Sequence, residues 1–401
     1  MPKAVKRPQV LMYVVNALFW MTVYIYVPQF SAYTKNEIGA TAAFVGLIAG
    51  SYGITQMLLR LPLGILSDKL RRRKPFILGG IAAGGLSSLL MFCFPLSPAM
   101  LLIGRLIAGL AACAYVQISI LFSSYFEGTT HSMGFVEGSS AMGQLIAMLL
   151  GGVIAGTIGY RYSFLASALV ALPGLALAAF ATESRKERQG FRLQDVVGTL
   201  TDRNLIVAAV LAIAAQGINF AKAFTFAPLA AASLAVPATQ GQLSIMTICF
   251  MLPTAIFGPL VAGKVLPRFG MRPVVTTGFA LHILACVLVP FSGTIGLLYL
   301  SQLLTGLGNS LSFPSLMSLS VSRLPDEKRA TAMGFYQAVY GLGIFAGPWL
   351  AGLLVDWFPA FQYNAAFLFT AVLAGFAAVA SAAFIPSGIG RRARPAAKAA
   401  D

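Results

Sequence analysis

Long apolar runs are the feature that most restricts how this chain can fold. A window of about 19 residues finds twelve of them, each long enough to cross a hydrocarbon core of roughly 30 Å. Because unpaired backbone groups are too costly in lipid and the runs are too long for barrel strands, each is expected to be a helix. The predicted spans are 9–31, 42–66, 75–94, 98–120, 133–157, 161–181, 205–227, 241–263, 273–292, 294–322, 331–356 and 363–385.

Composition agrees with this prediction of an all-α, polytopic membrane protein. Hydrophobic residues make up 58% of the chain and charged residues only 10%, far outside the range of soluble domains. The net charge of +16 would suggest a nucleic-acid partner in a soluble protein. In a membrane protein the positions of the basic residues matter more than their sum. We therefore expect the lipid bilayer, and no nucleic acid, as a partner.

Lysine and arginine residues gather at alternate ends of the predicted spans. With both termini in the cytoplasm, most of the 28 basic residues fall on the cytoplasmic side, and only Lys35 and Arg161 fall outside. The positive-inside rule therefore predicts an N-in, C-in topology. No small-residue cleavage site follows the first span, so we expect it to be retained. Three basic residues remain within predicted spans: Arg60, Arg105 and Lys222.

The two halves of the sequence repeat each other. The string MGF occurs at 133–135 and again at 333–335, and Pro28 matches Pro228 at the same offset. Such matches predict two pseudo-symmetric six-helix bundles of the same topology. The predicted parts are an N-terminal bundle at 1–181, a cytoplasmic linker at 182–204, a C-terminal bundle at 205–390 and a basic cytoplasmic tail at 391–401.

A charged loop interrupts the apolar pattern at "LPLGILSDKLRRRKPFILGG", residues 61–80. It resembles the loop between helices two and three of the major facilitator superfamily. The pattern there is Gly, three residues, Asp, Arg or Lys, any residue, Gly and a basic cluster. Arg71 stands where the family usually has glycine, and a partial copy in the second half has Pro267 in the aspartate position. Together with the spans and the repeat, the resemblance covers essentially the whole chain.

The resemblance implies the fold of this superfamily and gives the loop a conformational role. In the family it acts like a latch between the halves that holds one access state. Physically, Asp68 can pair with neighbouring arginines and with a helix N-terminus. Alternatively, the basic residues serve only to orient the chain. The latch residues implied by the resemblance are Gly64, Asp68, Lys69, Arg72 and Arg73.

Arg105 lies in "RLIAG", which is similar to the Arg-x-x-x-Gly element of many proton-coupled members of the superfamily. A guanidinium at that depth is costly unless it faces the bundle interior and has a partner. We expect a role in ligand binding or coupling, with a structural anchor near the cavity floor as the alternative. Gln302 at the pseudo-equivalent position leaves the charge in one half only.

Polar residues of the first and seventh spans form two further candidate faces. Because these helices line the central cavity in the family, we expect the two faces to point at each other across it. Alternatively, the lysine of the seventh span extends to the outer interface. The residues are Asn16, Trp20 and Tyr24 at steps of four, and Gln216, Asn219 and Lys222 at steps of three.

Acidic residues are scarce within the spans. Glu137 is the only carboxylate plainly inside one. A cavity with Arg105, Lys222 and Arg60 but without matching carboxylates would be electropositive in a low dielectric, which favours anionic substrates. Transporters of cationic drugs usually need a membrane-embedded carboxylate, and only Glu137 could serve here.

Small residues in the fifth and eleventh spans predict close helix packing. They partly match a glycine–proline element of drug–proton antiporters, but glycine permits close contact and proline a bend without any such function. These residues are Gly143, Gly151, Gly152, Gly343, Gly347 and Pro348. The four cysteines are expected to be free, and the lone His131 and His282 lack metal-site spacing, so no metal and no cofactor are expected.

The function predicted from the sequence is secondary active transport by alternating access in the inner membrane of a bacterium. The favoured substrate is a small organic anion or amphiphilic metabolite, coupled to protons, and the expected working unit is a monomer. The alternative is a proton-coupled multidrug efflux antiporter. A non-transporting membrane sensor is a different class, and an enzyme is not expected because no catalytic constellation is found.

Overall fold

The computed structural model describes residues 7–126, 129–183 and 201–389, and every regular element in these ranges is helical. The elements of the first half are α1 Arg7–Tyr24, α2 Val27–Asn36, α3 Ala42–Lys69, α4 Lys74–Cys93, α5 Pro98–Cys113, α6 Tyr115–Ser124, α7 Thr129–Thr157 and α8 Arg161–Ala179. Those of the second half are α10 Arg203–Ile218, η1 Asn219–Phe226, α11 Ala227–Ala232, α12 Gln240–Leu260, η2 Val261–Val265, α13 Leu266–Phe269, α14 Met271–Val287, η3 Val289–Phe291, α15 Ile295–Ser320, α16 Asp326–Trp357, η4 Pro359–Phe361 and α17 Asn364–Phe384.

The predicted spans coincide with these helices. Among the described residues, eleven helical segments are long and apolar enough to cross a membrane. The remaining predicted span is α15, a helix of 26 residues that packs between α12 and α14. Gln302, Asn309 and several serines lower the hydropathy of α15, and these side chains are buried. Because α15 directs its polar groups inward, its hydropathy underestimates how well it suits a membrane.

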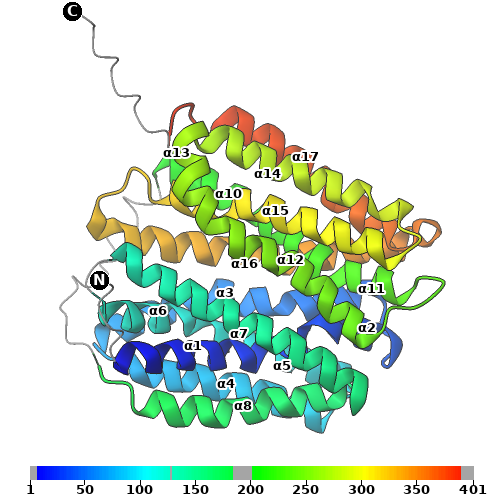
Figure 1. Cartoon of the computed structure of the whole chain (residues 1–401), viewed down its shortest axis with the longest axis horizontal. Helices are drawn as coiled ribbons and strands as arrows, with labels where there is room; N and C mark the ends of the chain where they lie inside the picture. The colour runs from blue at the N-terminus through cyan, green and yellow to red at the C-terminus, as the bar shows by residue number, and fades with distance from the viewer. Residues whose placement is uncertain (1–6, 127–128, 184–200, 390–401) are drawn as a thin grey trace, which may run out of the picture.

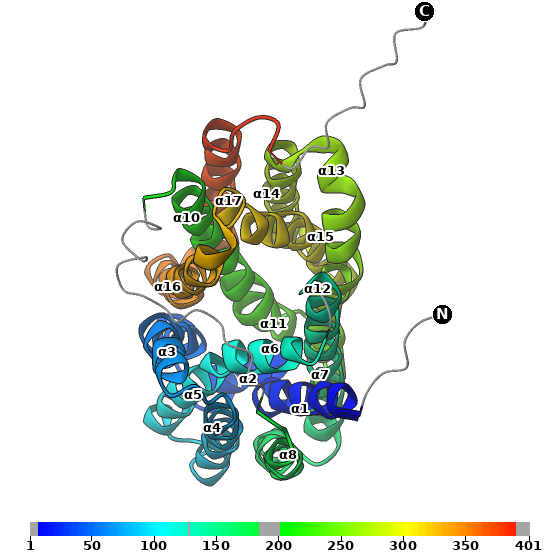
Figure 2. The ribbon, with the colours of Figure 1, turned by 90° about the vertical axis from the view of Figure 1, so that its left-hand side faces the viewer.

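The helices form two groups, α1–α8 and α10–α17, which lie side by side (Figures 1 and 2). The axes of most of the long helices are roughly aligned, and the chain runs back and forth along them. We call the end where α1 begins and α17 ends the inner end, and the end that holds α2 and α11 the outer end. The all-α, two-bundle fold expected from the sequence is confirmed. Most of the predicted linker, residues 184–200, and the whole predicted tail, residues 391–401, fall outside the described residues.

The halves meet most extensively where α3 runs along α16. A Cβ atom added at Gly46 would lie 2.1 Å from the carbonyl oxygen of Pro348, and one added at Gly50 would lie 2.5 Å from that of Phe345. At the outer end of this contact, a Cβ at Gly352 would lie 2.3 Å from the carbonyl oxygen of Ala42. Glycine therefore allows backbone-to-backbone contact along the boundary between the halves.

The small residues singled out in the sequence also lie at helix contacts. A Cβ at Gly143 would meet the carbonyl oxygen of Ala17 in α1, and one at Gly343 would meet that of Ile213 in α10, at 2.3 and 2.1 Å. Since α7 and α16 are pseudo-equivalent, the two bundles use the same packing. The remaining small residues of this set also lie at close helix contacts: Gly151 against Ile25, Gly152 against Ser244, Gly347 against Gly217, and Pro348 against Gly46.

Three hydrogen-bonded contacts tie the halves together at the outer end. Gln29 Nε2 donates to Ser244 Oγ at 2.6 Å, and Ser31 Oγ donates to the carbonyl oxygen of Phe224 at 3.1 Å. The carboxylate of Asp356 accepts hydrogen bonds from the backbone of α3. The structure therefore has the halves joined on the side of α2 and α11.

Candidate functional site

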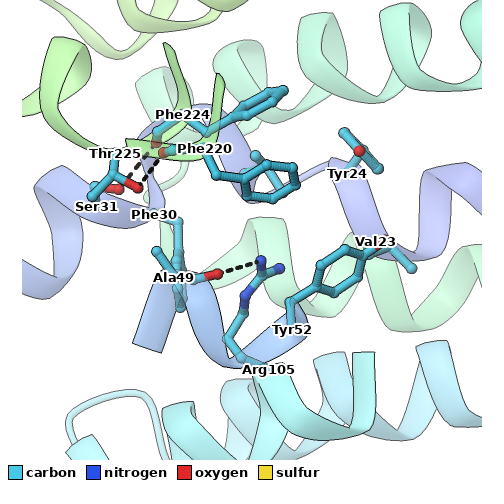
Figure 3. A pocket seen from close by; sticks show the side chains of 11 residues that line it. Val23, Tyr24, Phe30, Ser31, Ala49, Tyr52, Arg105, Phe220, Phe224 and Thr225 are labelled. Atoms are coloured by element: carbon cyan, nitrogen blue, oxygen red, sulfur yellow. Dashed lines mark hydrogen bonds between the residues drawn. The ribbon is translucent and has the colours of Figure 1, made fainter. Parts of the chain in front are cut away.

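A pocket lies between the two halves (Figure 3). Residues from α1 to α3 and from α5 form one side, and η1 of the second half forms the other. The wall is mostly aromatic and aliphatic, with one charged side chain, which is typical of a small-molecule site. The lining residues are Val23, Tyr24, Val27, Phe30, Ser31, Ala49, Tyr52, Arg105, Phe220, Phe224 and Thr225.

Arg105 supplies the charge of the pocket. Its side chain is only 5% exposed, and it donates from Nη2 to the carbonyl oxygen of Ala49 at 3.1 Å and from Nη1 to the hydroxyl of Tyr26 at 3.3 Å. The guanidinium carbon lies 4.9 Å from the ring centroid of Tyr52, while Nε has no hydrogen-bond partner. Within the described ranges no carboxylate is paired with it. The cation is therefore held by neutral oxygens and aromatic faces, which leave its charge uncompensated.

Aromatic rings from both halves surround this cation. Tyr52 of α3 stacks on Phe220 of η1 with their centroids 6.2 Å apart, and Phe220 contacts Phe224 at 5.2 Å. Tyr24 of α1 faces Phe224 at 6.5 Å. Such rings offer apolar surface on which the flat face of a ligand can pack. The pocket thus combines one cationic group with an aromatic wall.

Arg60, another predicted candidate, lies outside this lining. Its side chain is buried, and it donates from Nη1 to the hydroxyl of Tyr340 at 3.0 Å and from Nη2 to the carbonyl oxygen of Ala112 at 3.4 Å. Because Tyr340 belongs to α16, the first of these bonds crosses between the halves. Arg60 therefore takes part in the contact between α3 and α16.

The expectation that the polar faces of the first and seventh spans point at each other is wrong for two central residues. Asn16 turns toward α7, where its Nδ2 donates to the carbonyl oxygen of Val136 and to the hydroxyls of Ser139 and Ser140. Lys222 likewise turns into its own half. A buried amide or ammonium group needs several acceptors, and backbone and hydroxyl oxygens of the same bundle provide them.

Lys222 is fully buried against α15. Its Nζ donates to Thr305 Oγ1 at 2.5 Å, to the carbonyl oxygen of Ser301 at 3.3 Å and to Gln302 Oε1 at 3.4 Å. The side chain therefore reaches neither the pocket nor the outer interface. The steps of three in the sequence assume an α-helix, but residues 219–226 form a π-helix, η1, which changes the direction of each side chain.

The other two polar residues of this region also bond within the second half. Asn219 Nδ2 donates to Asn309 Oδ1 of α15 at 2.7 Å and to Gln216 Oε1 at 3.4 Å. Asn309 Nδ2 in turn donates to the hydroxyl of Thr254 in α12. Of the predicted set on the seventh span, none lines the pocket, whereas the neighbouring Phe220, Phe224 and Thr225 do.

Glu137 belongs to a second polar cluster in the first half. The hydroxyl of Tyr115 donates to Glu137 Oε1 at 2.7 Å, and the ring of Tyr115 lies 5.1 Å from that of Trp20. Trp20 is buried, and its Nε1 has no hydrogen-bond partner. Trp20 also contacts Tyr24, a pocket residue, at 5.5 Å. A carboxylate–aromatic cluster therefore adjoins the pocket without pairing with Arg105.

The predicted latch loop joins α3, which ends at Lys69, to α4, which begins at Lys74. Ser67 Oγ accepts a hydrogen bond from Arg73 Nη1 and donates to the carbonyl oxygen of Arg72. A Cβ at Gly64 would meet nothing within 4 Å, so packing does not require glycine there in this conformation. The side chain of Asp68 lies outside the part of the chain that the structure describes.

Sequence reasoning missed the carboxylate that does cap this loop. Glu183 accepts hydrogen bonds from the backbone N–H groups of Arg73, at 2.9 Å, and Lys74, at 2.7 Å, at the start of α4. A carboxylate at a helix N-terminus is favourable because of the helix dipole. In the sequence, only the position of Glu183 just after the sixth predicted span indicated that it could lie near this loop.

The aromatic wall was missed as well. Phe30, Tyr52, Phe220 and Phe224 stand within apolar runs, where a phenylalanine or tyrosine carries no mark that separates a pocket residue from a packing residue. Among the described residues, no group of three or more His, Cys, Asp or Glu side chains could hold a metal ion, and all four cysteines are free.

Comparisons with known proteins agree with this architecture. The inner membrane transport protein YajR of Escherichia coli is 31% identical over 166 residues, which cover 41% of this chain but only 36% of that protein. The class H tetracycline resistance protein of Pasteurella multocida is 23% identical over 349 residues, which cover 83% of this chain and 84% of that protein.

Among solved structures, a mutant of the nucleoside transporter NupG superposes with a TM-score of 0.81 at 15% identity, covering 95% of this chain and all of that one. This likeness concerns the fold. The sequence model of the Major Facilitator Superfamily matches residues 12–234 and 205–400, so that it spans both halves. The chain belongs to the Major Facilitator Superfamily.

Proposed function

We propose that this protein is a secondary active transporter that moves an amphiphilic organic anion by alternating access. The observation that carries the proposal is the environment of Arg105, a pocket cation that no carboxylate of the described residues neutralises. An anionic group of the substrate would pair with the guanidinium, and its apolar body would pack on Tyr52, Phe220 and Phe224.

The position of the pocket supports transport. Its walls come from both halves, so a movement of one half against the other changes access to it. The contacts of Gln29, Ser31 and Asp356 join the halves at the outer end, and they would have to break before the pocket opens there. One chain supplies both walls, so we propose the monomer as the working unit. The bacterial relatives support an inner-membrane location. We also propose that protons are the coupling ion.

The test is uptake of naphthalene-1-sulfonate into proteoliposomes that contain the purified protein, under an imposed pH gradient. A sulfonate keeps its negative charge at all working pH values, so it does not leak across the bilayer as a neutral acid. We expect the wild type to take it up and Arg105→Gln to abolish uptake. Arg161→Gln is the matched control, because Arg161 lies against Phe92 at the surface, away from the pocket.

The same assay separates the proposal from a sensor. A membrane sensor that does not transport would bind naphthalene-1-sulfonate, or another ligand, without any flux across the bilayer. Binding by the purified protein without uptake, with the protein correctly folded and oriented, would contradict transport. Uptake that is equal in the wild type and Arg105→Gln would contradict the role of the guanidinium.

Multidrug efflux is the second candidate, favoured by one cluster and one relative. Glu137, Tyr115 and Trp20 place a carboxylate beside aromatic rings, which suits a cationic, flat molecule. A relative is named for tetracycline resistance. If this candidate is right, cells expressing the protein export ethidium, Glu137→Gln abolishes the export and Arg105→Gln leaves it intact.

A further inference from the structure

The second half contains a buried lysine that the pocket does not use. Lys222 has no exposed surface, and its three hydrogen-bond acceptors, from Ser301, Gln302 and Thr305, are all uncharged. No carboxylate of the described residues pairs with it. Burying an ammonium group without a counter-charge is costly, and within a membrane such groups usually have a function. This residue therefore calls for an explanation beyond packing.

A histidine of α14 faces the same helix as this lysine. A Cβ added at Gly308 of α15, three residues after the acceptor Thr305, would lie 3.3 Å from His282 Nε2, and Cys286 lies one turn further along α14. His282 is fully buried, and neither Nδ1 nor Nε2 has a hydrogen-bond partner. A neutral imidazole has one nitrogen that donates a hydrogen bond and one that accepts, and at His282 neither of these bonds is made. Lys222 and His282 can each bind a proton, but two positive charges in this site would repel each other. The pair therefore holds one proton more readily than two.

The surroundings add no other titratable partner. Cys286 bonds with the hydroxyl of Thr370 at 3.3 Å. The sequences of α11 and α17, which pack against η1, contain no titratable residue. The titratable residues of α2, α3, α10, α12 and α16 that the structure describes form no hydrogen bond or ion pair with Lys222, and Tyr299 of α15 donates instead to the carbonyl oxygen of Gln242. The site thus consists of Lys222, His282 and Cys286 with the neutral acceptors of α15.

The lysine is mechanically connected to the pocket. It belongs to η1, whose Phe220, Phe224 and Thr225 line the pocket while Lys222 points to α15. A π-helical segment inside a transmembrane helix is a common functional device, since it is less regular than an α-helix. A change in how Lys222 holds α15 would therefore shift the aromatic wall that faces the substrate.

The first half lacks this chemistry. The position pseudo-equivalent to Lys222 is Thr22, whose hydroxyl donates to the carbonyl oxygen of Phe19 at 2.7 Å. A Cβ added at Gly84 of α4 would lie 2.3 Å from Thr22 Oγ1, so a small residue stands opposite this position. The two bundles share a fold, but only the second buries titratable groups here. The difference argues against a purely structural role that both halves would need.

We propose that Lys222 is the proton-binding site that couples transport to the proton gradient, separate from the substrate site at Arg105. This inference rests on the proposed function. In the step, the lone pair of Nζ takes one proton from hydronium of the solution, which leaves a water molecule and gives the ammonium, and release reverses it. The ammonium donates three hydrogen bonds to α15, whereas the amine donates only two, so deprotonation loosens η1 from α15. Phe220 and Phe224 then move relative to Arg105.

The first arm of the test needs no substrate. Proton uptake by the purified protein is followed with a pH-sensitive dye in weakly buffered detergent solution as the pH is scanned through the neutral range. The wild type should take up about one proton more per molecule than Lys222→Met. The matched control is Lys264→Met, since Lys264 is an exposed lysine in the other π-helix, η2, and its removal should leave the count unchanged.

The second arm separates coupling from substrate binding. Lys222→Met should abolish gradient-driven accumulation of naphthalene-1-sulfonate in proteoliposomes but keep its exchange at equal concentrations within about twofold of the wild type. Arg105→Gln should lose both. Lys222→Arg serves as a second variant if methionine impairs folding, because a permanently charged arginine should also lose accumulation while keeping exchange.

Two results would overturn the proposal. One is a proton count that does not differ between the wild type and Lys222→Met, and the other is accumulation that Lys222→Met leaves intact. If the wild type does not transport the sulfonate at all, the proposed substrate class fails, while the proton count still decides the role of Lys222.

Discussion

Asp356, near the end of α16, caps the N-terminus of α3. Its two carboxylate oxygens accept hydrogen bonds from the backbone N–H groups of Ala42, at 2.9 Å, and Ala43, at 2.7 Å. The carboxylate thus lies where the helix dipole favours a negative charge. Since α3 and α16 belong to different halves, one side chain fastens the outer end of the boundary between them.

Removing this cap should favour opening at the outer end. Asp356→Ala loses a charge-assisted contact worth about 1 kcal/mol at an exposed helix terminus. That corresponds to about a fivefold shift toward the state in which the outer end is open. The shift is measured as faster labelling of Thr225→Cys by an impermeant maleimide added from the outer side, with the four native cysteines replaced by alanine.

The matched control is another carboxylate that caps a helix within one half. Asp202 accepts a hydrogen bond from the backbone N–H of Leu205 at 2.9 Å at the start of α10. Asp202→Ala should leave the labelling rate at the outer end unchanged. Equal effects of the two substitutions would mean that the cap of Asp356 does not hold the halves together.

Close backbone contact between α3 and α16 should make glycine necessary there. A Cβ added at Gly53 would lie 2.5 Å from the carbonyl oxygen of Gly341, whereas one added at Gly79 of α4 would meet nothing within 4 Å. Gly53→Ala is therefore expected to destabilise the protein by about 1–3 kcal/mol through overpacking. Gly79→Ala should be neutral or stabilising by up to about 1 kcal/mol, since alanine favours a helix. Thermal unfolding in detergent compares the two, and an equal Tm would refute the packing argument.

Arg71 has a backbone conformation that suits glycine. Its φ is 50°, in the left-handed region, and it stands where the superfamily loop usually has glycine. A non-glycine residue in this region costs roughly 1–2 kcal/mol. Arg71→Gly should therefore raise the free energy of unfolding by about 1 kcal/mol, after the added freedom of the unfolded chain is counted. Arg72→Gly, at a position without positive φ, should not raise it. A fall in Tm for Arg71→Gly would show that its side chain contributes more than the strain costs.

Much of the fold was readable from the sequence because lipid leaves few choices. Apolar runs of membrane-spanning length must be helices, and the repeat requires two like bundles. Arg105 was readable too, because a lone arginine in an apolar run stands out. Phe220 and Phe224 were not, because aromatic residues in such a run have no distinct pattern.

The direction of Lys222 could not be read for a different reason. The sequence gives no sign that residues 219–226 form a π-helix, and without it the lysine is expected to face the cavity. Its acceptors come from residues about 80 positions away in α15, and a pattern of local spacing contains no such information. Asn16 was misjudged in the same way, because its partners lie in α7.

The most direct measurement for the central claim is the affinity of the purified protein for naphthalene-1-sulfonate, by calorimetry, in the wild type, Arg105→Gln and Arg161→Gln. A hydrogen bond to a charged group contributes about 1.5–3 kcal/mol, so Arg105→Gln should raise Kd by about 10-fold to 100-fold. Arg161→Gln should bind like the wild type. An unchanged Kd in Arg105→Gln, or a pocket that binds ethidium in preference to the sulfonate, would contradict the account.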